Sequence, residues 1–147
     1  MTSNIYTLDV VLQPRPDLMT MASFSRQAAF TETPARYSQS TANTSAFRAD
    51  VHTWFFETSY APKPEMVLTS TLLYSRADNF NDFSDMGLPL GADNGRLDLT
   101  LGVKFLLNKY VTIEPEYAFY HFKANPDSEF GNYNAHVIFL DVSVTWA

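Results

Sequence analysis

A strict alternation of apolar and polar residues near the C-terminus is the feature that most limits how this chain can fold. From residue 97 to residue 105 the apolar side chains occupy odd positions, while Asp98, Thr100 and Lys104 occupy even positions. A helix would spread those polar residues around its circumference, whereas a strand places them all on one side. The alternation therefore predicts a strand with one apolar face and one polar face.

Several other segments carry the same period or are rich in strand-forming residues, although the faces are less cleanly separated in the first half of the chain. These segments lie at residues 6–12, 18–26, 48–60, 66–76, 96–106, 111–121 and 137–146. We expect an all-β chain with about six antiparallel up-and-down strands, in a single domain that spans residues 1–147.

The connections between these segments differ in length in a systematic way. Short turns are expected at residues 14–17, 62–65 and 107–110. Long polar connections are expected at residues 27–47, 77–95 and 123–134. Long loops are uncommon in a compact domain unless they serve a function. The pattern predicts short turns at one end of the sheet and long loops at the other.

Together these features resemble the C-terminal part of a Gram-negative outer-membrane β-barrel. Such barrels have strands of about 9–11 residues, apolar outside and polar inside, with short periplasmic turns and longer extracellular loops. The last segment is the most specific, because apolar residues alternate up to Trp146 and it looks like the signal strand that the barrel-assembly machinery recognises. The family usually ends on the aromatic residue itself, whereas here Ala147 follows it.

The resemblance implies a location in the outer membrane, with membrane lipid around the sheet, the short turns periplasmic and the long loops extracellular. Counting strands back from a periplasmic C-terminus gives the same sidedness. The smallest single-chain barrels have eight strands, and residues 1–4 lack the basic region of a signal peptide. We therefore expect the C-terminal portion of a longer barrel that includes the remaining strands, or a short subunit that completes a barrel with a protein partner or as a homo-oligomer.

The alternation also assigns residues to the two faces of the expected barrel wall. The predicted lipid-facing residues are Leu97, Leu99, Leu101, Val103, Phe105, Ile138, Leu140, Val142, Val144 and Trp146. The predicted lumen-facing polar residues are Asp98, Lys104, Glu114, Glu116 and Asp141, with Arg26, Arg48, Arg76 and Arg96 near strand ends. These charges either orient ions in a pore or form structural ion pairs, such as Lys104 with Glu114 or Glu116.

Two smaller groups of residues have both a functional and a structural interpretation. His121 and His136 could form a metal pair, but an interfacial aromatic belt with Tyr117, Phe119 and Tyr133 is the favoured interpretation. The acidic segment at residues 77–85 could supply oxygen ligands for calcium, but its spacing does not match an EF-hand. A solvated extracellular loop with aromatic anchors is favoured there.

The resemblance implies the wall of a pore or transport channel. A narrower version is a scaffold around a periplasmic electron-transfer partner, since residues 132–136 are similar to barrels that sheath a multihaem cytochrome. The alternative, from another class, is a soluble β-sandwich that binds a ligand or carbohydrate through its long loops, because a sheet packed on a core alternates in the same way.

Composition excludes other classes of function. Ten Lys and Arg against 16 Asp and Glu give a net charge of −6, which argues against a nucleic-acid partner because phosphates need a basic surface. The chain has no cysteine, so it cannot form a disulfide or a thiolate metal site. With no catalytic set and no phosphate-binding loop in the sequence, we expect no enzyme activity and no cofactor.

Overall fold

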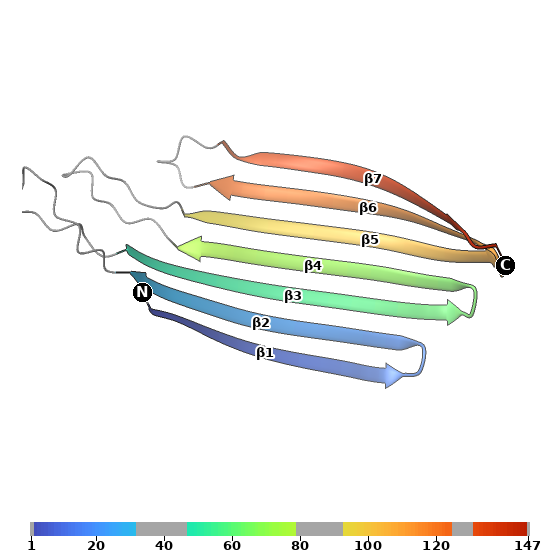
Figure 1. The fold of residues 1–147 in the computed structure, drawn as a ribbon, viewed down its shortest axis with the longest axis horizontal. Helices are drawn as coiled ribbons and strands as arrows, with labels where there is room; N and C mark the ends of the chain where they lie inside the picture. Colours follow the sequence, from blue (N-terminus) through green and yellow to red (C-terminus); the bar gives the residue numbers. More distant parts are fainter. Residues whose placement is uncertain (1, 32–46, 79–92, 125–130, 147) are drawn as a thin grey trace, which may run out of the picture.

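The computed structural model describes residues 2–31, 47–78, 93–124 and 131–146, and these residues form one antiparallel sheet (Figure 1). The strands are β1 (Thr2–Arg15), β2 (Leu18–Thr31), β3 (Phe47–Lys63), β4 (Met66–Asp78), β5 (Asn94–Asn108), β6 (Val111–Ala124) and β7 (Tyr133–Val144). Each strand pairs with its neighbours in the sequence, in the order β1 to β7, and the sheet is not closed. The predicted all-β, up-and-down architecture is confirmed. No helix in the described ranges is long and apolar enough to cross a membrane.

Two details of the predicted strands are wrong. The described residues form seven strands rather than about six, because each of the four N-terminal segments forms a strand of its own. The strands have 12 to 17 residues, rather than about 9–11, because backbone pairing continues past the apolar alternation into flanking residues such as Asn94, Gly95 and Asn134. β7 is shorter than predicted at its C-terminal end and stops at Val144, although the Thr145 amide still donates to the Tyr110 carbonyl at 2.9 Å.

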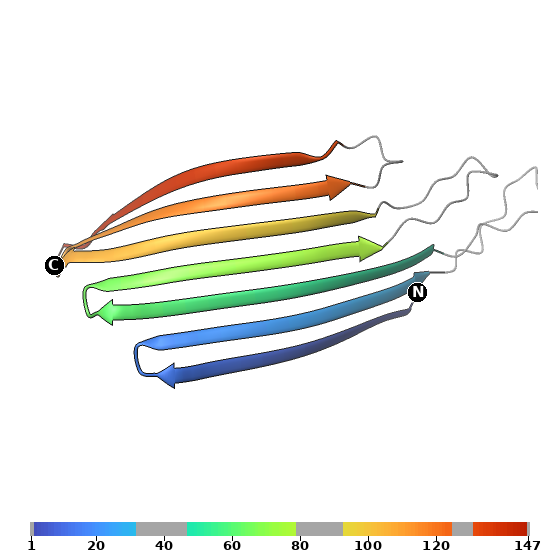
Figure 2. The same cartoon turned by 180° about the vertical axis from the view of Figure 1, so that it is seen from behind.

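The three short turns lie on one edge of the sheet, which we call the turn edge, together with the C-terminus (Figures 1 and 2). Each turn leaves two residues between paired strands, at 16–17, 64–65 and 109–110. In the last turn, the Asn108 side-chain oxygen accepts hydrogen bonds from the Tyr110 and Val111 amides at 2.8 and 3.1 Å. This side chain replaces a backbone partner, as Asn commonly does in turns.

The opposite edge, which we call the loop edge, holds the N-terminus and the strand ends that flank the long connections (Figure 1). β2, β4 and β6 end there, and β3, β5 and β7 begin there. The third connection runs from Ala124 to Tyr133 and is shorter than predicted, because β6 and β7 both extend toward it. The short turns and the longer connections therefore lie on opposite edges of the sheet, as predicted.

The strand registers assign the residues to two faces, because residues directly opposite each other in an antiparallel ladder share a face. We call the first face the apolar face. It carries Tyr6, Leu8, Val10, Leu12, Phe24, Trp54, Phe56, Leu68, Leu72, Tyr74, Leu97, Leu99, Leu101, Val103, Phe105, Ile113, Tyr117, Phe119, Ile138, Leu140, Val142 and Val144. We call the second face the polar face. It carries Asp9, Glu57, Arg96, Asp98, Lys104, Glu114, Glu116 and Asp141.

Candidate functional site

The apolar face is uncovered in the described part of the chain. The buried hydrophobic residues among the described ones are Ala77, Ala118 and Ala124, all on the polar face, and no large described side chain is fully buried. By contrast, Ile138 is 81% exposed and Leu8 is 64% exposed. Contiguous apolar surface of this kind normally marks a site where a protein or a membrane packs. The apolar face is therefore the candidate functional surface.

Charged residues border the apolar face but do not enter its centre. At the turn edge, Arg15 pairs with Leu18 and Lys63 pairs with Met66. At the loop edge, the ladder row of this face includes Arg26, His52, Arg76, Gly95 and Lys123. Between these rows, the described strand residues of the face include no Asp, Glu, Lys or Arg, and their only titratable imidazoles are His121 and His136 on β6 and β7. We call this region the charge-free band.

Aromatic rings line the boundary of the charge-free band on the loop-edge side. Trp54 lies between Phe24 and Tyr74, with ring centroids 5.2 and 5.6 Å apart. Because indole and phenol rings have an apolar body and a polar end, they favour the boundary between an apolar and an aqueous region. This row therefore marks where the surroundings of the sheet would change from apolar to polar.

A second aromatic group lies on the same face between β6 and β7, and it corrects the predicted belt in one position. The Tyr117 hydroxyl and His136 Nδ1 are hydrogen-bonded at 2.8 Å, and the Phe119 ring lies 5.0 Å from the His136 ring. Tyr133 does not belong to it. Strand alternation places Tyr133 on the polar face, where it stacks on Phe122 with centroids 5.4 Å apart.

The two histidines of the predicted metal pair make separate contacts. His121 Nδ1 lies 2.6 Å from the Asn134 side-chain oxygen, whereas His136 contacts Tyr117. Among the residues that the structure describes, no group of three or more His, Cys, Asp or Glu side chains could hold a metal ion. Most of the acidic segment at 77–85 lies outside the described residues, since β4 ends at Asp78.

An ionic cluster occupies the loop-edge end of β2 and β3 on the apolar face. Arg26 donates to both carboxylate oxygens of Asp50, at 3.1 and 2.5 Å. His52 Nε2 lies 3.3 Å from the same carboxylate and its ring stacks on Trp54 with centroids 6.0 Å apart. Bidentate Arg–carboxylate pairs have a fixed geometry, so this cluster holds the charges at the boundary of the band.

The structure changes the predicted face of some of the arginines that were expected near strand ends with the lumen-facing set. Arg26 and Arg76 lie on the apolar face, whereas the side chain of Arg48 lies outside the part of the chain that the structure describes. Arg96 lies on the polar face, where it is paired with Asp98 at 2.5 Å. The interpretation was wrong for Arg26 and Arg76, because a face can be assigned from one strand to the next only when the registers are known.

The polar face holds every residue of the predicted lumen-facing set of Asp98, Lys104, Glu114, Glu116 and Asp141. Lys104 Nζ lies 3.9 Å from Glu114 Oε2, which is one of the two pairs expected across this hairpin. Two further acidic residues of this face, Asp9 and Glu57, were missed. Asp9 accepts a hydrogen bond from Ser23. Their alternation signal is weak because Val11 and Phe55 share their face.

The polar face is closely packed where β4, β5 and β6 meet. Gly102 pairs with Thr69 on one side and Glu116 on the other, and the neighbouring Ala118 is fully buried. A Cβ atom at residue 102 would lie 2.6 Å from the Thr69 hydroxyl oxygen. Only glycine fits this position without a shift of Thr69.

Substituting Gly102 with alanine is expected to lower the free energy of unfolding by about 1–3 kcal/mol, because the added methyl group overpacks the face. Thr69→Ala removes the hydroxyl and should restore most of this loss in the double variant, measured by urea unfolding in detergent micelles. Gly95→Ala is the control, since nothing lies within 4 Å of its added Cβ atom. A double variant as unstable as Gly102→Ala alone would contradict the contact.

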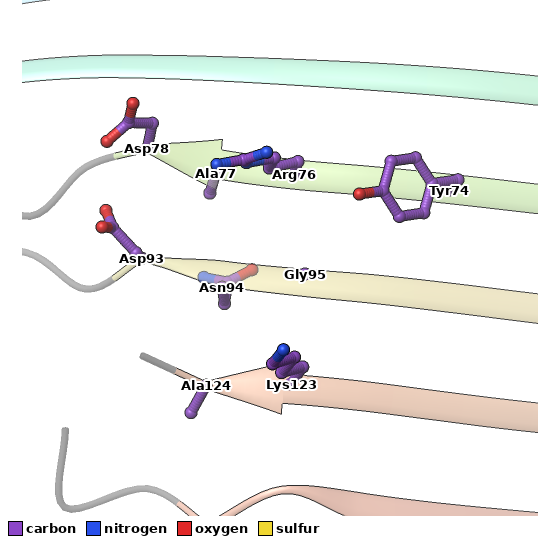
Figure 3. A pocket seen from close by; sticks show the side chains of 9 residues that line it. All are labelled: Tyr74, Arg76, Ala77, Asp78, Asp93, Asn94, Gly95, Lys123 and Ala124. Atoms are coloured by element: carbon purple, nitrogen blue, oxygen red, sulfur yellow. The ribbon is translucent and has the colours of Figure 1, made fainter. Parts of the chain in front are cut away.

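A hollow of about 370 Å³ lies at the loop edge, at the ends of β4, β5 and β6 (Figure 3). Arg76 and Lys123 flank Gly95 in the ladder, and Asp78 and Asp93 line the same hollow. Two cations and two carboxylates leave no net charge, so the hollow does not favour an anion or a cation.

Comparisons of the chain with protein-family models, with curated proteins and with solved structures find no match. The fold itself defines the class, which is an all-β protein with a seven-stranded, open, up-and-down antiparallel sheet. Within that class, two surfaces bear on the function. They are the charge-free band of the apolar face and the charged polar face.

Proposed function

We propose that the chain forms part of the wall of an outer-membrane β-barrel that acts as a pore or transport channel. The observation that carries the proposal is the charge-free band, which is exposed in the described part of the chain and bordered by charged residues on both edges. Apolar side chains that face hydrocarbon need no protein core. A sheet whose backbone groups all pair across strands satisfies the backbone without water.

The dimensions of the band support this proposal. On β4 the uncharged residues of the apolar face extend from Met66 to Tyr74. Eight residue steps in a strand cover about 27 Å. With a strand tilt of about 40°, the height becomes about 21 Å, close to the apolar band of about 25 Å of outer-membrane barrels. The aromatic row at Trp54 and Tyr74 then lies where an interfacial girdle is expected.

A soluble β-sandwich is the alternative, and it requires a second layer on the apolar face. The described residues form one sheet, and Leu140 and Leu8 on that face are more than half exposed. A sandwich would keep charges out of its core in the same way, so the exposure of the apolar face in the described residues is what distinguishes the two architectures. These features favour the membrane over a second sheet.

The polar face becomes the lumen in this proposal. Its carboxylates outnumber its cations, which are Arg96 and Lys104. Charged rings and patches of this kind select among ions in pores. The proposal includes three further expectations. The turn edge is periplasmic, the loop edge is extracellular, and the barrel-assembly machinery recognises β7.

Spin labels on neighbouring residues of opposite faces test the proposal directly. Labels at Leu101 and Val142 should be quenched by a lipid-soluble relaxation agent in a bilayer, because both residues lie on the apolar face. Labels at Thr100 and Ser143 should respond to a water-soluble agent or be shielded by the lumen. A chain that stays folded and monomeric in plain buffer, with Leu101 shielded and no affinity for detergent, would overturn the proposal.

A further inference from the structure

The loop-edge end of the apolar face carries its polar residues at three successive levels (Figure 3). Tyr74 lies at the boundary of the charge-free band. Arg76 lies one level further out, in a ladder row with Gly95 and Lys123. Asp78 lies further out again, and successive levels are two residues, or about 7 Å, apart along β4. The order from the band outward is therefore an aromatic level, a cationic level and an acidic level.

The cationic level has an open space between two long basic side chains, within the hollow of about 370 Å³. Gly95 on β5 lies between Arg76 on β4 and Lys123 on β6, so the two cations are two strand spacings, or about 10 Å, apart. Nothing lies within 4 Å of a Cβ atom placed on Gly95. Both cations are exposed, and neither forms an ion pair within the described ranges. We call this space above Gly95 the basic gap, and a compact anion in it is within reach of both side chains.

Another part of the same row has its cation already paired. Arg26 on β2 is held by both oxygens of the Asp50 carboxylate, and His52 contacts that carboxylate as well. Asp78 lies opposite Asp50 in the ladder, but it forms no ion pair with Arg76 in the part of the chain that the structure describes. The row therefore contains a closed cluster on β2 and β3 and an open group on β4 to β6.

We propose that the basic gap binds the headgroup of a membrane lipid that carries a phosphate and, further from its acyl chains, an ammonium group, as in phosphatidylethanolamine. The phosphate accepts charge-assisted hydrogen bonds from the Arg76 guanidinium and the Lys123 ammonium. The ammonium of the lipid, two carbons further out, donates to the Asp78 carboxylate. The acyl chains lie against the charge-free band. This inference rests on the proposed membrane location of the sheet and adds the class of lipid that the sheet recognises.

Charge complementarity favours this class of headgroup over an anionic one. The hollow is lined by two cations and two carboxylates and has no net charge, but its opposite charges lie at different levels (Figure 3). An anionic headgroup without an ammonium would pair with Arg76 and Lys123 and bring its negative charge close to Asp78. A headgroup with an inner phosphate and an outer ammonium matches both the cationic and the acidic level.

Quenching of Trp54 fluorescence measures occupancy of the basic gap, because this indole lies opposite Tyr74, with ring centroids 5.6 Å apart. Trp146 is the other tryptophan of the chain and is replaced by phenylalanine. The full chain is placed in micelles of an uncharged maltoside detergent. Phosphatidylethanolamine or phosphatidylglycerol with a spin label near the glycerol end of one acyl chain is then titrated in. We expect half-maximal quenching at a several-fold lower mole fraction of phosphatidylethanolamine than of phosphatidylglycerol.

Four substitutions test the chemistry of the site. Lys123→Gln removes a phosphate partner and should weaken quenching by both lipids several-fold. Gly95→Leu should do the same while keeping every charge, because the new side chain fills the open space above Gly95. Asp78→Asn removes the ammonium partner and should make the two lipids equally effective. Arg26→Gln is the matched control, since it removes a cation of the same row outside the basic gap and should leave the preference unchanged.

Equal quenching by the two lipids in the parent chain would overturn the headgroup site while leaving the membrane location in place. Loss of the preference in Arg26→Gln would also overturn it, because the attraction would then come from the whole row. Free phosphoethanolamine at the concentration of the lipid should not relieve the quenching, and relief would overturn the assignment to a lipid in favour of a soluble phosphate compound. No quenching by either lipid, in a chain that stays folded without bound detergent, contradicts the membrane location itself, and the inference with it.

Discussion

An arginine in place of Leu101 is expected to lower the free energy of unfolding of the inserted chain by about 2–4 kcal/mol, as for a cation near the bilayer midplane. Leu101 lies in the middle of β5 on the apolar face and is 44% exposed. Its surroundings in the proposed barrel are hydrocarbon, which cannot hydrate a guanidinium group. Urea titration of the protein in liposomes, followed by tryptophan fluorescence, measures the loss.

Two control substitutions show separately how the loss depends on depth in the bilayer and on the face of the sheet. Val111→Arg lies at the start of β6, next to the turn edge, where the cost should fall to about 0–1 kcal/mol. Ser143→Arg lies on the polar face of β7 in an exposed position and should also be tolerated. A loss at Leu101 no larger than the loss at Ser143 would show that the apolar face does not contact lipid.

The second large effect is an all-or-none difference in chemical labelling between the two edges of the sheet. A bulky membrane-impermeant maleimide should label Gly131→Cys on intact cells, because this residue precedes β7 at the loop edge and has open space around its Cβ position. Lys63→Cys, at the turn edge, should react only after the outer membrane is permeabilised.

Two outcomes of the same labelling experiment would contradict the proposed orientation. Equal reaction of Gly131→Cys and Lys63→Cys on intact cells would remove the proposed orientation, and labelling only at Lys63 would invert it. Asn81 and Ser128 are the positions that the sequence suggests for the extracellular side, but they lie outside the described residues. Asn108→Cys provides a second turn-edge position, because it ends β5 there.

The faces of the last three strands were predictable because a side-chain period of two is unambiguous over nine or more residues. Every predicted lipid-facing residue within β5 and β7 lies on the apolar face, and only Trp146 falls beyond a strand end. Whether that face contacts lipid is a separate matter that stays a prediction. The alternation tells which side chains share a face, but it does not tell what covers them.

The first half of the chain was less predictable for a physical reason. Its polar face contains Ile5, Val11 and Phe55, so apolar residues occur on both sides of the strands. The relation between strands depends on the register after each turn, and the registers shift between Leu12 and Arg15 and between Tyr60 and Lys63. Sequence patterns do not reveal such shifts, which is why the faces of Arg26 and Arg76 were missed.

Each strand of this sheet contacts only the strands next to it in the sequence. In such a one-dimensional arrangement, the stability of the whole is close to a sum of neighbouring pairs, as in repeat proteins. A change in one connection at the loop edge therefore disturbs at most the two strands that it joins. The sheet and its connections can therefore diverge separately in evolution, so that new surface chemistry is acquired without a new architecture.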